Sequence, residues 1–473
     1  MFDNLEETRY PFNNFLEFIG GGYWQQTGAI HLFLGWVFII ALTISFLRTR
    51  KYPLHFRTAT LYFALTIFTN PAYDFAGLKI NEIFGIFSIA VSTITRNRQS
   101  PLFSPKSPIV LGLLAVFLVG ALHNLLVAFI YPELNPDAKV VITRTAVNLK
   151  ILTLAVNLLI VSHTLKQRTG IGFLLKTLVI SGTFGLAMYL LQGVVLLFTG
   201  IFPYGTFLDA GFIGIPTFGS VSIERGHFGK FMAPLFPFFL YCQMIYRWRL
   251  PFYLLIFVAC INFSSSSQTF FLAFGLLAIW LFRSKFTHGY ASIGIVLLAV
   301  AISTFVIIYW KAFFAVGVKI WELAFVGDES TGGGRSIGTF SQYIEKYPFG
   351  IGYSGSTLRT APGLPEINAA HFAFFAQYSL LAIPIIFSFL WLVLRTIRIA
   401  KAQRTNVALT RNMIIAVLGS CLIFAADILW FIPTIWLAYE IIWTMKPHFR
   451  SSTSYATPIS SLNARPINNT HTA

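Results

Sequence analysis

Charged residues are scarce in this chain. They make up 11% of its 473 residues, whereas hydrophobic residues make up 56% and aromatic residues 17%. A soluble domain usually contains about 25% charged residues. A disordered chain is poor in aromatic residues and rich in charge. The composition therefore excludes both an ordinary soluble globular protein and a disordered one.

Cysteines and clustered acidic residues are also few. The only cysteines, Cys242, Cys260 and Cys421, all lie within apolar runs, so the chain has neither a disulfide framework nor a metal-ligand spacing. It has no Asp-rich metal motif, and we expect neither a metal nor another cofactor. Residues 1–27 lack a basic segment followed by an apolar core, so we expect an interfacial segment rather than a cleavable signal peptide.

Basic residues outnumber acidic residues by 34 to 17, which gives a formal net charge of +17. The basic residues cluster in short segments between apolar runs. This pattern is the topology signal of a membrane protein, and we expect no nucleic-acid partner.

The apolar runs predict an all-α, polytopic membrane protein, because a helix needs about 20 apolar residues to cross a bilayer. We expect 12 or 13 transmembrane helices, near residues 28–47, 57–72, 80–95, 109–131, 141–162, 171–199, 227–246, 251–264, 268–283, 290–310, 371–394, 412–430 and 432–446. Four serines separate 251–264 from 268–283, so this pair forms either two spans or one re-entrant hairpin.

The basic residues also predict an orientation, with the N-terminus outside and the C-terminus in the cytoplasm. The segments that would then face inward hold 21 of the 34 basic residues and none of the 17 acidic ones. The chain divides into an N-terminal interfacial segment (1–27), a bundle of about ten spans (28–310), a large periplasmic loop (311–370), C-terminal spans (371–446) and a disordered cytoplasmic tail (447–473).

A few polar residues lie inside the expected spans. A structural ion pair would join Lys150 to Glu82 or to Glu440, and a polar cavity open to the outside is the alternative. We expect Lys176 to reach toward the inner face. His123 lies in the middle of a span and is predicted to pack between helices.

Other polar residues gather on the outer side. Arg225 and Lys230 flank the start of one span, and Arg335 and Arg359 lie in the large loop. Several arginines at one membrane face suit a diphosphate, because a guanidinium binds phosphate oxygens in a bidentate way. His371 opens the next span, and an imidazole there can accept a proton from a hydroxyl. The alternatives without a role in catalysis are arginines that are solvated or bound to lipid phosphates, and a histidine that simply lies at the membrane interface.

Three stretches, in order, resemble the O-antigen ligase and O-antigen polymerase superfamily of bacterial inner-membrane glycosyltransferases. They are ERGHFGKFMAPLFP (224–237), RSIGTFSQYIEKYPFGIGY (335–353) and AHFAFFAQYSLLAIP (370–384). A topology with many spans and one large outer loop before the last few is similar as well.

The resemblance implies an activity and its partners. The donor would be a glycan on undecaprenyl pyrophosphate, and the acceptor a hydroxyl of a growing glycan or of the lipid A core. Arg225 and Arg335 would bind the pyrophosphate and His371 would be catalytic. Lys230, Tyr353 and Arg359 are expected substrate contacts. From their residue type alone, Tyr343, Tyr347 and Tyr353 could stack on sugar rings, and packing against the membrane is the alternative for each of them.

The active site would face the periplasm of a bacterial inner membrane, among membrane lipids, and a chain-length regulator would be a further partner. Gln268 and Phe372 stand where the family often has Arg and Asn, which favours a polymerase over a ligase. Two other classes stay open at this point. A transporter of lipid-linked oligosaccharide would show two related halves, and a non-catalytic scaffold would not need Arg225, Arg335 or His371.

Overall fold

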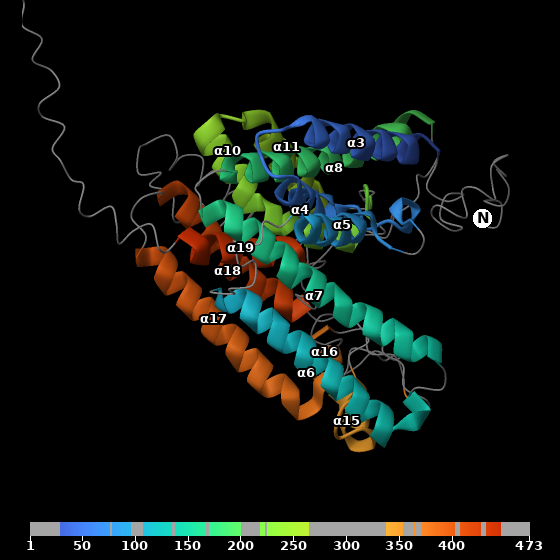
Figure 1. Ribbon diagram of the computed structural model, residues 1–473. Coiled ribbons are helices and arrows are strands. Elements are labelled where there is room, and N and C mark those ends of the chain that lie inside the picture. Colours follow the sequence, from blue (N-terminus) through green and yellow to red (C-terminus); the bar gives the residue numbers. More distant parts are fainter. Residues whose placement is uncertain are drawn as a thin grey trace, which may run out of the picture.

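A computed structural model describes the chain over residues 29–75, 78–95, 107–134, 138–166, 170–199, 218–222, 225–263, 337–352, 364, 370–402, 407–426 and 432–445. These residues are almost entirely helical (Figure 1). They contain no β-strand, and one isolated bridge joins Phe75 to Leu78. The all-α expectation is confirmed for the described part of the chain.

The helices have the following bounds. The α-helices are α3 (Ala29–Arg48), α4 (Leu54–Ala64), α5 (Ile80–Ile94), α6 (Pro108–Ile130), α7 (Ala138–Lys166), α8 (Ile171–Thr199), α9 (Arg225–Met232), α10 (Phe236–Tyr246), α11 (Arg249–Phe263), α15 (Ile337–Lys346), α16 (Ala370–Tyr378), α17 (Ala382–Ala402), α18 (Val407–Ala426) and α19 (Pro433–Met445). Short 3₁₀ segments are η1 (Leu65–Ile67), η2 (Pro71–Tyr73), η3 (Pro132–Leu134), η4 (Ala233–Leu235) and η7 (Ser379–Leu381).

Within the described residues, six helical stretches are long and apolar enough to cross a membrane, as expected of a multi-pass membrane protein. They are His31–Arg48, Pro108–Ile130, Asn148–Leu165, Ile171–Phe198, His227–Tyr246 and Phe374–Ala402. Helices α4, α5, α11, α18 and α19 overlap five more of the expected spans, although α4 ends at Ala64, before the expected end at residue 72. The expected spans 268–283 and 290–310, the interfacial segment and the C-terminal tail lie outside the described residues.

Two basic residues, Arg57 and Lys176, each contact the end of a neighbouring helix. The Arg57 guanidinium donates to the carbonyls of Phe46 and Leu47 at the end of α3, over 2.6 and 2.7 Å. Lys176, in the first turns of α8, places its ammonium 4.1 Å from the ring centre of Tyr246 at the end of α10. Lys176 thus contacts the end of a neighbouring helix. That it reaches toward the inner face stays a prediction.

A buried polar network lies where α6, α7 and α19 meet. Glu440 of α19 is fully buried and accepts hydrogen bonds from Ser107, at the start of α6, and from Thr444. The Thr444 hydroxyl lies 3.0 Å from that of Ser162 in α7. Hydrogen bonds of this kind offset the penalty for burying a polar group among apolar side chains.

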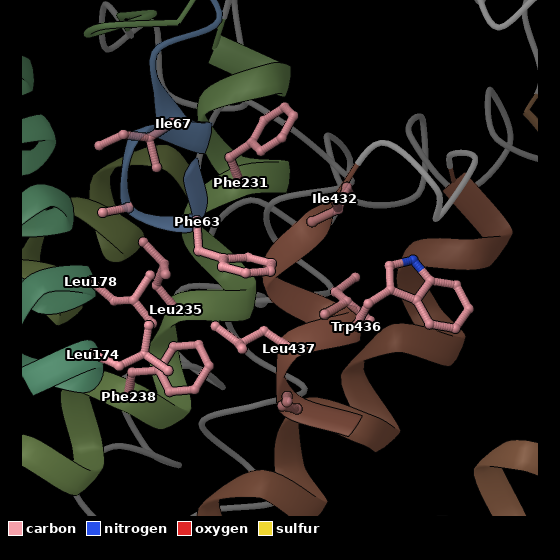
Figure 2. Close-up of a cluster of buried hydrophobic side chains, with 14 of the residues drawn as sticks. Phe63, Ile67, Leu174, Leu178, Phe231, Leu235, Phe238, Ile432, Trp436 and Leu437 are labelled. Atoms are coloured by element: carbon pink, nitrogen blue, oxygen red, sulfur yellow. The ribbon is translucent and has the colours of Figure 1, made fainter. Parts of the chain in front are cut away.

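One large hydrophobic core joins the helices. Figure 2 shows side chains of α4, α8, α9, α10 and α19, with the adjoining 3₁₀ segments, converging on it. Phe63, Leu174, Leu178, Phe238 and Leu437 are each no more than 1% exposed. Away from this part of the core, α6 and α7 lie side by side. Helices α15 and α16 lie near the end of α6 that connects to α7 (Figure 1).

The expected ion pair inside the bundle is confirmed, between Lys150 of α7 and Glu82 of α5. Lys150 Nζ lies 2.8 Å from Glu82 Oε1, and the side chains are 37% and 15% exposed. The other oxygen, Glu82 Oε2, accepts the backbone N–H of Lys79 over 3.3 Å and so caps the start of α5. Glu82 therefore holds α5 against α7 and also stabilises its first turn.

We predict that Glu82→Gln destabilises the protein by about 1 kcal/mol, because it removes a partly buried ion pair and leaves Lys150 without its charge partner. Thermal unfolding in detergent, followed by fluorescence-detected size exclusion, measures the loss. Glu133→Gln, at an exposed position of η3, is the matched control. Equal melting temperatures for Glu82→Gln and the control would contradict the role of the pair.

Candidate functional site

The site residues expected from the sequence fall on two helices and on undescribed segments. Arg225 is the first residue of α9, Lys230 is partly buried in the same helix, and His371 is the second residue of α16. The side chains of Arg225 and His371 are outside the described part of the structure. Arg335, Tyr353 and Arg359 lie outside the described residues altogether. That these residues form one site stays a prediction.

Two of the three family-like stretches, 335–353 and 370–384, do meet. After α15 the chain makes a turn at 348–352, which we call the loop turn, and this turn docks on α16. The Ile351 N–H donates to the Ala376 carbonyl over 2.9 Å, and the Gly352 N–H donates to the Gln377 carbonyl over 3.2 Å. The Ser379 hydroxyl donates to the Pro348 carbonyl.

The docking depends on an interruption in the span. Helix α16 ends at Tyr378, Ser379 has a left-handed φ of 49°, and α17 begins at Ala382. Pro384 favours the interruption, because its ring conflicts with the carbonyl four residues earlier and it has no N–H. The last carbonyls of α16 therefore lack helical partners. The amides of the loop turn take their place.

Gly350 is required at the loop turn for two reasons. Its φ is +84°, which disfavours any residue with a Cβ atom. A Cβ on Gly350 would also lie 2.3 Å from the Gln377 carbonyl oxygen and 3.1 Å from that of Ala376. The Gly350 N–H closes the turn by donating to the Tyr347 carbonyl over 2.8 Å.

A small apolar cluster holds α15 and the loop turn against the end of α6. Its buried members are Val127, Leu134, Tyr343, Tyr347, Ile351 and Ala376. The Tyr131 ring packs edge-on against Tyr347, with centroids 5.1 Å apart. The described part of the large loop is thus fixed to the bundle through α6 and α16.

His123 of α6 contacts the loop turn, which the sequence did not predict. Its Nε2 lies 2.7 Å from the Phe349 carbonyl oxygen, and its side chain is 4% exposed. The imidazole also stacks on the Tyr378 ring of α16, with centroids 5.8 Å apart. The expected packing between helices is therefore present, together with a contact across 226 residues of sequence that no local pattern reveals.

The amide of Gln377 lies at the same interruption. Its side chain is fully buried, and within the described residues neither its nitrogen nor its oxygen has a hydrogen-bond partner. A buried amide nearly always has a partner in a folded protein. The unpaired amide of Gln377 is therefore an exception within the described residues.

A second interrupted span carries the remaining family-like stretch. Helices α9 and α10 are separated by η4, and Pro234 and Pro237 stand at the interruption. Helix α18 packs against both η4 and α16. The two interrupted spans therefore flank a common neighbour. Interrupted helices at membrane depth are tolerated where they are buried in protein or line a polar cavity.

Four charged residues gather around the start of α5, namely Asp74, Lys79, Glu82 and Lys150. Burial raises the pKa of Asp74 from 3.8 to about 6, against the opposing effect of Lys79. Burial, followed by the nearby charge of Lys150, lowers the pKa of Lys79. Desolvation thus outweighs pairing at both residues.

Nothing in the described residues brings three His, Cys, Asp or Glu side chains together as a metal site. The expectation of a metal-independent protein stays a prediction. No protein-family model, curated protein or solved structure matches the chain. The resemblance to the O-antigen superfamily therefore depends on the three sequence stretches and on the topology predicted from the sequence.

We predict that Gly350→Ala displaces the loop turn, because the new Cβ would meet the Gln377 carbonyl at a strained φ. Limited proteolysis should then cut the chain near residue 350 at least several times faster than in the wild type. Gly112→Ala in α6, where a Cβ meets nothing within 4 Å, is the control and should leave the cleavage rate unchanged. Equal cleavage of the two variants would contradict this account of Gly350.

We predict that Asp74 makes the protein less stable as the pH rises from about 4 to about 6. Because its folded pKa is raised, the folded state binds the proton more tightly than the unfolded chain does, so this stabilisation is complete below pH 3.8 and lost above about pH 6. Asp74→Asn should reduce the difference in melting temperature between pH 4.5 and pH 7.5. Glu345→Gln, on the exposed side of α15, should preserve the wild-type difference.

Proposed function

We propose that the protein is a membrane glycosyltransferase of the O-antigen polymerase or ligase type. It would transfer a glycan from undecaprenyl pyrophosphate to a hydroxyl of an acceptor glycan at the periplasmic face, with polymerisation favoured. The observation that carries the proposal is the docking of the loop turn on α16. It joins the stretch that begins with Arg335 to the helix that contains His371.

The proposed reaction breaks the bond between the anomeric carbon and the pyrophosphate oxygen and forms a bond from that carbon to the acceptor oxygen. The leaving pyrophosphate gains negative charge, which Arg225 and Arg335 would stabilise as preorganised bidentate donors. His371 would take the proton of the acceptor hydroxyl or orient that hydroxyl. We expect an inverting, metal-independent displacement.

The position of Arg225 supports its role. It is the first residue of α9, and the N-terminus of a helix carries a partial positive charge that favours an anion. Lys230, in the last turn of the same short helix, adds a second cation. Arg359 and Tyr353 follow the loop turn and would contact the pyrophosphate and a sugar ring, respectively.

The two interrupted spans also favour a second candidate, a transporter of lipid-linked oligosaccharide. Discontinuous helices in transporters form substrate sites near the middle of the bilayer. Among glycan transferases, a ligase that uses the lipid A core as acceptor is the alternative to a polymerase. A chain-length regulator is a further proposed partner.

Reconstitution in liposomes tests the proposal. The purified chain would receive undecaprenyl-pyrophosphate-linked glycan from its host, in the presence of a chelator. A ladder of longer lipid-linked glycans is expected of a polymerase, and transfer only after addition of lipid A core is expected of a ligase. Movement of intact lipid-linked glycan across the bilayer without any new glycosidic bond would favour the transporter.

We predict that Arg335→Ala lowers the transfer rate roughly a hundredfold, the usual loss on removing one donor that stabilises the charge of a transition state. Arg335→Lys should also lose much of the rate, because lysine lacks the bidentate fork. Initial rates in the same liposomes measure both. Arg398→Ala, an exposed residue of α17, is the control. Near-normal rates for both Arg335 variants at normal protein levels would remove Arg335 from the site.

A further inference from the structure

His123 is a buried imidazole in the middle of an apolar helix, and it contacts a distant loop. It lies two helical turns before the end of α6, and leucine, valine and phenylalanine predominate among its neighbours in that helix. Burying an imidazole in such surroundings is unfavourable unless it forms a hydrogen bond. The described partner of Nε2 is the carbonyl of Phe349, the second residue of the loop turn.

The chemistry of this contact assigns the proton. A backbone carbonyl only accepts hydrogen bonds, so His123 Nε2 must carry the hydrogen and donate it. The Tyr378 ring stacks on the imidazole and limits its rotation. His123 is thus a fixed donor toward the loop turn, whether the imidazole is neutral or protonated.

The contact adds a constraint that the α16 contacts do not give. The amides of Ile351 and Gly352 tie the loop turn to the end of α16, and His123 ties Phe349, two residues before Ile351, to α6. Two helices that are distant in sequence therefore hold one turn from two sides. A turn held from two sides can neither slide along α16 nor rotate about it.

We propose that His123 is a positioning residue for the proposed transfer reaction. The inference rests on the proposed function and adds a residue outside the three family-like stretches. The loop turn is followed directly by Tyr353, and its partners in α16 come five and six residues after His371. His123 fixes the loop turn, which precedes Tyr353 in the chain and contacts the helix that contains His371. His123 does not touch the reacting atoms.

Three substitutions at His123 separate this role from simple packing. Glutamine places its amide nitrogen near the position of His Nε2, so His123→Gln keeps the donor to Phe349. Asparagine is polar but shorter, so His123→Asn loses that donor, and His123→Leu removes all polar character. Because Gln and Asn share the same chemistry, their comparison carries the test even where the Leu variant fails to fold.

Two measurements are made on the full chain in liposomes. The first is the initial rate of glycan transfer, with kcat and KM for the lipid-linked donor. We expect His123→Asn and His123→Leu to lower kcat about tenfold, as for the loss of one hydrogen bond, with little change in KM. His123→Gln should stay within about threefold of the wild type.

The second measurement is hydrogen exchange of the peptide that covers residues 347–352, which needs no activity. Exchange should be faster than wild type in the Asn and Leu variants and restored in the Gln variant. His31→Asn is the control, since it alters another buried imidazole, in α3, and should change neither readout.

The outcomes are distinct. Unchanged exchange in the Asn and Leu variants would show that His123 does not hold the loop turn, and faster exchange with a normal kcat would show that its hold does not serve the reaction. Either result overturns the inference. A wild-type chain that transfers no glycan would instead reject the proposed function, and the exchange experiment would still decide whether the contact exists.

Discussion

The structure depends on satisfying backbone hydrogen bonds in apolar surroundings. Inside a membrane no water is present to donate a hydrogen bond to an unpaired carbonyl, so a span is normally one continuous helix. Here the span at 370–402 is interrupted, and the carbonyls of Ala376 and Gln377 are free of helical partners. The loop turn supplies the missing donors. The described part of the large loop, residues 337–352, is therefore coupled to an interruption in a membrane helix.

This coupling explains several separate features. Gly350 lets the backbone of the turn approach α16 closely, and the tyrosines of α15 fill the space against α6. On the opposite side of the bundle, Arg57 performs a similar task by capping the carbonyls at the end of α3. The charged residues near α5 obey the same constraint, since Glu82 both pairs with Lys150 and caps its own helix.

The sequence predicts the helical class and most span positions, because long apolar runs admit few other structures. It also anticipates the pair of Lys150 with Glu82, since a charge in a span needs a partner. It does not reveal the interruption at Ser379 or the contact from His123 to Phe349. The first depends on a single proline and a local φ, and the second joins residues that only the tertiary fold brings together. The structure places Arg225 and His371 on helices, whereas Arg335 lies outside the described residues. The grouping of the three residues into one site therefore rests on the sequence.

The interruption in the span at 370–402 also bears on the order of assembly. The chain is made from the N-terminus, so α6 with His123 exists first, the loop turn next and α16 last. When α16 reaches the membrane, the donors for its free carbonyls are already present on the preceding segment. An interrupted helix alone would be unfavourable in the bilayer. Because the segment that donates the missing hydrogen bonds precedes α16 in the chain, that segment is available when α16 inserts.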